Sequence, residues 1–174
     1  ELWADNSELG NWLGGRNVAV KIGNDIFIHG GLHRGSIEAG YTNEEINTLF
    51  KSNARIASRS ARSTAVFASA TETMPGPIAC RNYIDSCYGK VPINDLNYVL
   101  EKCEAEKMII GNCTVSDVKY ADLANYGNRV IAIAVDHTKY AYNTSRERSA
   151  GMLVENGTYY SVSYKGSKAM LDQW

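Results

Sequence analysis

The chain has few of the features that mark membrane proteins, nucleic-acid-binding proteins or disulfide scaffolds. Its 174 residues include only four cysteines and three prolines, and its basic and acidic side chains balance to a net charge of −1. The cysteines form no C-x-x-C pair and are too sparse for a disulfide framework. A nearly neutral chain has no electrostatic reason to bind nucleic acid or an anionic membrane. No apolar run approaches the roughly 18 residues that a membrane-spanning helix needs.

The sequence opens at Glu1 rather than at a methionine, so we expect a processed product or a piece of a longer chain. Its first residues lack the basic, apolar and small-residue succession of a secretion signal. With so few cysteines, this favours an intracellular setting, in the cytoplasm or an organelle. The 44% hydrophobic content is ordinary for a globular protein. We expect residues 1–174 to form a single domain with one core.

Two turn signals predict β-hairpins. Gly23-Asn24 separates an alternating run at 18–22 from an apolar run at 26–28. Asn156-Gly157 separates residues 151–155 from residues 158–164. Both dipeptides favour the tight two-residue turns that join antiparallel strands.

Helix and strand signals lie between these hairpins. Residues 42–45 (TNEE) form a capping box that predicts the start of a helix. Asn94 is expected to cap a second helix, which has an apolar face. The apolar stretches at 107–111 and 130–135 are predicted to be buried strands, because they do not alternate with polar residues. This order predicts an α/β fold with a mixed sheet and a C-terminal antiparallel hairpin.

The most informative run is DIFIHGGL at residues 25–32, where a histidine follows an apolar strand and precedes two glycines. A rigid strand end is a good support for a metal-binding imidazole. The glycines let the backbone turn sharply and let a ligand approach closely. His29 is therefore a candidate metal ligand, although a histidine that only hydrogen-bonds to the backbone fits the same run.

Four segments occur in a characteristic order: IFIHGGL at 26–32, GPIACR at 76–81, MIIGNCTV at 108–115 and VIAIAVD at 130–136. This order resembles the second half of the calcineurin-like metallophosphoesterases, and among them most closely the Shewanella-like branch of the phosphoprotein phosphatases. The resemblance covers nearly the whole chain. It implies part of a metallophosphatase-type β-sandwich flanked by helices, with the first half of the domain missing.

The resemblance also implies roles for particular side chains. His29 would bind the second of two metal ions, and Arg81 would contact two phosphate oxygens, for which a planar guanidinium is suited. Tyr140 or Tyr142 would take the position of the family's active-site tyrosine, and spacing does not decide between them. The family's reaction is hydrolysis of phosphomonoesters by two Mn, Fe or Zn ions about 3.5–4 Å apart, which activate a bridging hydroxide.

Several positions depart from the family pattern. A second metal-binding histidine falls on Asn112, and a neutral carboxamide is a weaker donor to such ions than an imidazole. The motifs GD-x-H-G, GD-x-x-D-R-G and GNHE, which supply most of the family's metal ligands, do not occur. We therefore expect a degenerate, catalytically inactive protein without a metal cofactor, acting as a structural or docking subunit of a larger assembly.

Three other interpretations of the sequence are possible. With a missing N-terminal half, the chain would belong to an active serine/threonine phosphoprotein phosphatase that holds two divalent ions. Without hydrolysis, Arg81 would recognise phosphorylated groups, or it would form a structural salt bridge. His29, His33 and His137 would form a separate metal site with Asp136, although we expect His33 in a surface loop.

Some of the candidate site residues also have a structural explanation. Asn112 is compatible with a plain turn residue, and Tyr140 and Tyr142 with half-buried packing. An incomplete sandwich would leave apolar sheet surface uncovered, which soluble monomers rarely tolerate. We therefore expect another protein chain, or the missing N-terminal half, to cover that surface.

Overall fold

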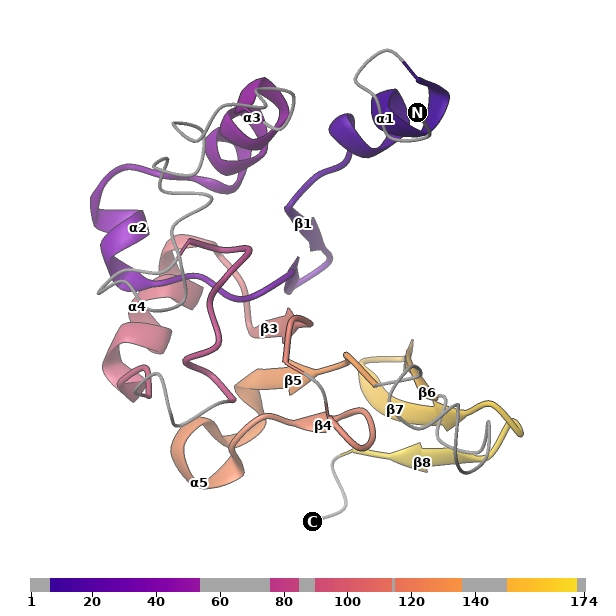
Figure 1. Cartoon of the computed structure of the whole chain (residues 1–174). Coiled ribbons are helices and arrows are strands. Elements are labelled where there is room, and N and C mark those ends of the chain that lie inside the picture. The colour runs from indigo at the N-terminus through magenta and orange to yellow at the C-terminus, as the bar shows by residue number, and fades with distance from the viewer. Residues whose placement is uncertain (1–6, 54–75, 85–89, 114, 136–149, 172–174) are drawn as a thin grey trace.

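The fold consists of two sheets packed face to face, with helices on the outer side of the larger sheet (Figure 1). The computed structural model describes residues 7–53, 76–84, 90–113, 115–135 and 150–171. None of the helices in these ranges combines the length and the apolar character needed to cross a bilayer.

The larger sheet has five strands in the order β1-β2-β3-β5-β4. β1 (Ala19–Ile22) and β2 (Asp25–Ile28) form the first predicted hairpin. β2 pairs in parallel with β3 (Lys107–Ile110), which pairs in parallel with β5 (Val130–Ala132). The two-residue strand β4 (Lys119–Tyr120) pairs antiparallel with β5 at the far edge. The mixed sheet that the sequence predicts is confirmed.

The strand predicted at 130–135 is too long. β5 ends at Ala132, and Val135 pairs only in an isolated bridge with Val115. The reason lies in the neighbouring strand, because β3 ends at Ile110, which is the register partner of Ala132. Beyond that point the described residues provide no continuous partner strand.

The helices are α1 (Glu8–Gly14), α2 (Arg34–Glu38), α3 (Asn43–Asn53), α4 (Ile93–Lys102) and α5 (Leu123–Tyr126). α3 begins with the predicted capping box. The Thr42 N–H donates to Glu45 Oε2 at 2.7 Å, and the Glu45 N–H donates to Thr42 Oγ1 at 3.2 Å. This pair satisfies two backbone donors at the helix start.

The cap predicted for α4 is wrong by two residues. Pro92, with φ −61° and ψ 145°, is the N-cap, and Asn94 lies within the first turn. Proline is pre-set for this position because its φ is fixed and it has no N–H to satisfy. The predicted apolar face is confirmed, since Leu96, Val99 and Leu100 are buried.

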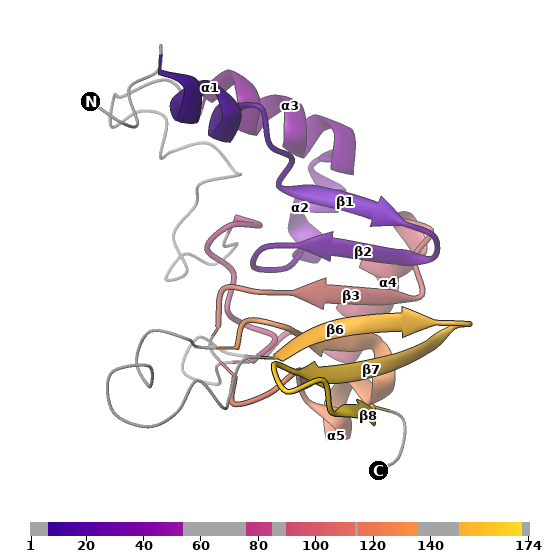
Figure 2. The same cartoon turned by 90° about the vertical axis from the view of Figure 1, so that its right-hand side faces the viewer.

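The smaller sheet consists of β6 (Ala150–Glu155), β7 (Thr158–Ser163) and β8 (Lys168–Met170), all antiparallel. The predicted turn between β6 and β7 is confirmed. Asn156 has φ 50° and Gly157 has φ 77°. Positive φ at both central residues is what a type I′ hairpin turn requires. Figure 2 shows this sheet in front of the larger one, with α2 and α4 behind.

A buried hydrogen bond joins the two sheets. The Tyr159 hydroxyl on β7 donates to Asp25 Oδ2 on β2 at 2.7 Å, and both residues are buried. Burial and the Asp25 carboxylate raise the pKa of Tyr159 well above its usual range. The raised pKa favours the protonated phenol, which is the form that donates this hydrogen bond.

Asn47 fixes α3 to the outer edge of β1. Its Oδ1 accepts from the N–H groups of Val18 and Ala19 at 2.7 and 3.0 Å, and its Nδ2 donates to Ala19 O at 2.7 Å. The amide thus makes the contacts at Ala19 that a neighbouring strand would make.

Asn47→Ala should destabilise the protein by about 2–3 kcal/mol, because three hydrogen bonds of about 1 kcal/mol each are lost. Urea unfolding followed by circular dichroism measures this change. Thr48→Ala, at an exposed position of the same helix, should shift stability by less than about 0.5 kcal/mol. Equal midpoints for the two variants would contradict the prediction.

Candidate functional site

The candidate site lies at the carboxyl ends of β2 and β3, where parallel pairing places two polar segments side by side. His29 follows β2, and Gly111 and Asn112 follow β3. The Gly111 N–H donates to His29 O at 2.8 Å. A Cβ on Gly111 would lie 3.3 Å from His29 O and 3.8 Å from His29 Nδ1, so the imidazole lies beside this glycine. His29 is exposed.

The turn at residues 76–84 packs directly on the two glycines that follow His29. The Gly30 N–H donates to Pro77 O at 2.7 Å. A Cβ on Gly30 would lie 2.7 Å from the carbonyl oxygens of Pro77 and Cys80, closer than real side chains approach backbone. Gly31 has φ 127°, and a Cβ there would lie 2.6 Å from the Tyr83 ring. Both positions therefore require glycine.

Tyr83 holds the Gly30-Gly31 segment and the turn at 76–84 together from the core side. Its ring fills the space over Gly31, and its hydroxyl donates to Leu32 O at 2.6 Å in the core. Burial raises the pKa of Tyr83 well above its usual range, which preserves this donor. No sequence motif singles out Tyr83, because its partners lie about fifty residues earlier in the chain.

The turn also brings Arg81 and Asn112 to the same edge as His29. Arg81 follows Cys80 and is exposed. Asn112 has φ 57°, a left-handed conformation that Asn tolerates better than most residues. Its Nδ2 donates to Cys80 O at 3.1 Å. The structure thus gathers three residues that the sequence places far apart, while their binding roles stay predictions.

His33, expected in a surface loop, lies in the short segment between β2 and α2 and is only partly exposed. It is the N-cap of α2, and its buried Nδ1 has no hydrogen-bond partner among the residues that the structure describes. The neighbouring Leu32 is fully buried, and its carbonyl accepts a hydrogen bond from the Tyr83 hydroxyl. This contact places the segment that contains His33 close to the core. His137, Asp136, Tyr140 and Tyr142 lie outside the described residues. Within the described residues, no three His, Cys, Asp or Glu side chains are grouped to hold a metal ion.

Two thiols are held in their neutral form. Burial raises the pKa of Cys80, beneath the site, and of Cys103, after α4, to about 11. A nucleophilic cysteine needs the opposite shift, because the thiolate is the reactive species. Neither thiol is suited to covalent catalysis.

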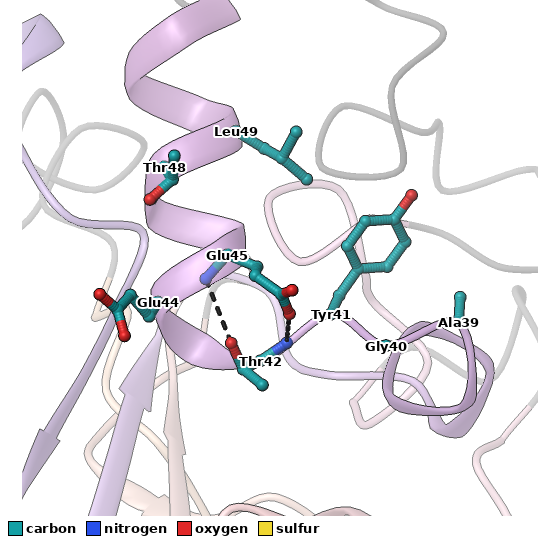
Figure 3. A pocket seen from close by; sticks show the side chains of 8 residues that line it. All are labelled: Ala39, Gly40, Tyr41, Thr42, Glu44, Glu45, Thr48 and Leu49. Atoms are coloured by element: carbon teal, nitrogen blue, oxygen red, sulfur yellow. Dashed lines mark hydrogen bonds between the residues drawn. The ribbon is translucent and has the colours of Figure 1, made fainter.

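A pocket in the described part of the chain lies away from this edge, between α2 and the first turns of α3. Its volume is about 560 Å³. Figure 3 shows Tyr41 and Leu49 on one side of the Thr42–Glu45 capping box and Glu44 on the other. None of the predicted site residues lines it. The full lining is Ala39, Gly40, Tyr41, Thr42, Glu44, Glu45, Thr48 and Leu49.

Comparison with known proteins defines the class of fold. No family model and no curated protein matches the sequence. A crystal structure of the cold-active protein-tyrosine phosphatase of a psychrophilic Shewanella species superposes with TM-score 0.78 and 22% identity, over 98% of this chain and 47% of that one. A mutant of such an enzyme gives the same values. The chain has a phosphatase-like α/β fold and spans about half the length of these solved structures.

Gly30→Ala should destabilise the protein by more than about 2 kcal/mol, because the new methyl group can fit only if the turn at 76–84 moves. Gly151→Ala is the matched control, since nothing lies within 4 Å of a Cβ there. It should change stability by less than about 0.5 kcal/mol. Urea unfolding of both variants measures the difference, and an undisturbed Gly30→Ala protein would refute the packing described above.

Proposed function

We propose that this chain is one half of a metallophosphatase-type domain whose metal centre is degenerate, and that it acts as a structural or docking subunit rather than as a hydrolase. The phosphatase-like fold supports the first part of this proposal. The hydrogen bond from the Asn112 amide to the Cys80 carbonyl supports the idea that this position no longer binds a metal ion.

Asn112 stands where the resemblance implies a metal-binding imidazole. Its side chain instead clamps the end of β3 to the turn that carries Arg81. The left-handed backbone at this residue suits a turn-forming asparagine. A side chain whose amide group is fixed to a carbonyl can offer an ion only its remaining oxygen, which is a weak ligand for Mn, Fe or Zn. Asn112 therefore stabilises the local fold and is poorly suited to bind a metal ion.

A second candidate function is metal-dependent hydrolysis of phosphomonoesters, with the remaining ligands supplied by another half of the domain. The exposure of both His29 and Arg81 at one edge favours it. In that complex His29 would hold one ion and Arg81 would bind two phosphate oxygens. Two bound ions would supply a hydroxide nucleophile and neutralise charge on the phosphoryl group. The raised thiol pKa values of Cys80 and Cys103 argue against a cysteine nucleophile at either position.

Asn112→His should raise the affinity for Mn²⁺ or Zn²⁺ at least about tenfold, the lower end of what a ligand or its support contributes. Isothermal titration calorimetry with each metal alone measures this affinity. Asn128→His, at an exposed position away from the site, is the control for adventitious binding by a new histidine. Equal affinities for the two variants would show that the edge of β2 and β3 is not a relict metal centre.

The proposal predicts no hydrolysis of p-nitrophenyl phosphate by the chain in its native assembly, with Mn²⁺ supplied. Colorimetric assay of the wild type, His29→Ala and Arg81→Ala should give equal background rates. Arg16→Ala, at an exposed arginine after α1, is the matched control for loss of a surface cation. Activity that His29→Ala and Arg81→Ala abolish and Arg16→Ala preserves would establish the second candidate instead.

A further inference from the structure

The β1–β2 hairpin exposes apolar side chains on the face where a sandwich should be covered. The register pairs Val20 with Phe27 and Ile22 with Asp25, so these side chains share one face. Asp25 accepts a hydrogen bond from Tyr159 of the smaller sheet, which identifies this face as the inner one. Yet Val20 is 38% exposed and Ile22 is 61% exposed.

The smaller sheet also exposes apolar side chains on its inner face, opposite the β1–β2 hairpin. Val154 pairs with Tyr159 and Met152 pairs with Ser161, so Val154 and Met152 also point toward the larger sheet. Val154 is nevertheless 42% exposed. Figure 2 shows β6 as the outermost strand of the smaller sheet on the side of the β1–β2 hairpin. We call this group the apolar corner; it consists of the exposed Val20, Ile22 and Val154 and their partly buried neighbours Phe27 and Met152.

Backbone groups are available beside this corner. β6 pairs only with β7 among the described strands. In a two-residue hairpin the residues that flank the turn, here Glu155 and Thr158, bond to each other. Alternation along the strand then directs the N–H and C=O groups of Val154 and Met152 toward the outer edge. A further strand can add there by ordinary ladder hydrogen bonds.

The nearby edge of β1 is less available. Asn47 already occupies the outward N–H and C=O groups of Ala19. The exposed apolar side chains of β1 are therefore best covered from the smaller sheet, by a strand beside β6.

We propose that the outer edge of β6 and the apolar corner form the docking surface for a strand from the other half of the phosphatase-type fold. The length of the comparison structures indicates this occupant, because 98% of this chain matches only 47% of theirs. More than half of that fold thus has no counterpart here, and the sandwich lies open at this corner. The inference rests on the proposed half-domain and holds whether or not a metal centre functions.

Site-specific photocross-linking of the full chain in its native assembly tests this inference. Benzoylphenylalanine at position 22 should cross-link, by mass spectrometry, to a polypeptide that matches the part of the Shewanella phosphatase structure left uncovered by this chain. The same probe at position 123 on α5, where Leu123 is 48% exposed, should give no such product. Cross-linking at position 22 to a second copy of this chain, to a protein of another fold, or to nothing would overturn the proposal.

A charge substitution provides an independent measurement. Ile22→Lys should reduce retention of the cross-linked polypeptide on the tagged chain about tenfold, whereas Leu123→Lys should leave it unchanged. Because Ile22 is exposed, its substitution should preserve folding, which circular dichroism checks. Unchanged retention with Ile22→Lys would overturn the proposal, while phosphatase activity of the assembly would bear only on the proposed function.

Discussion

The candidate site depends on the contact between two glycines and a distant turn. Gly30 and Gly31 leave no room between the end of β2 and residues 76–84, so the carbonyl oxygens of Pro77 and Cys80 lie where a methyl group would otherwise be. Tyr83 fixes the turn from the core side through its bond to Leu32. This contact is the reason why His29, Arg81 and Asn112 share one edge, although they belong to three separate segments.

Local chemistry determines the elements that the sequence predicts correctly. The turns at Gly23-Asn24 and Asn156-Gly157 and the capping box at 42–45 each involve residues close in the chain. The cap of α4 differs from its prediction by only two residues within one segment, whereas other differences depend on distant neighbours. The end of β5 follows from the end of β3, and the partial burial of His33 follows from the contact of its neighbour Leu32 with Tyr83. Such contacts leave no periodic signal in one sequence.

The candidate site shows the same contrast between what the sequence indicates and what contacts between distant segments determine. The resemblance indicates which residues meet at the edge of the sheet, and the structure places His29, Arg81 and Asn112 there. The resemblance does not indicate that the Asn112 side chain donates a hydrogen bond to the Cys80 carbonyl. No sequence pattern specifies where the backbone of Cys80 lies. At 22% identity the solved structures define a fold, and the chemistry has to be argued from individual side chains.

The hydrogen bonds from Asn47 to β1 have a consequence for how copies of this chain meet one another. Unpaired sheet edges invite identical molecules to join edge to edge, which is a common route to insoluble fibres. Here a side-chain amide occupies the outward N–H and C=O groups of Ala19 at one edge of the larger sheet. The strand at the other edge has only two residues, Lys119–Tyr120. Both edges of the larger sheet therefore carry features that limit its growth by edge-to-edge pairing.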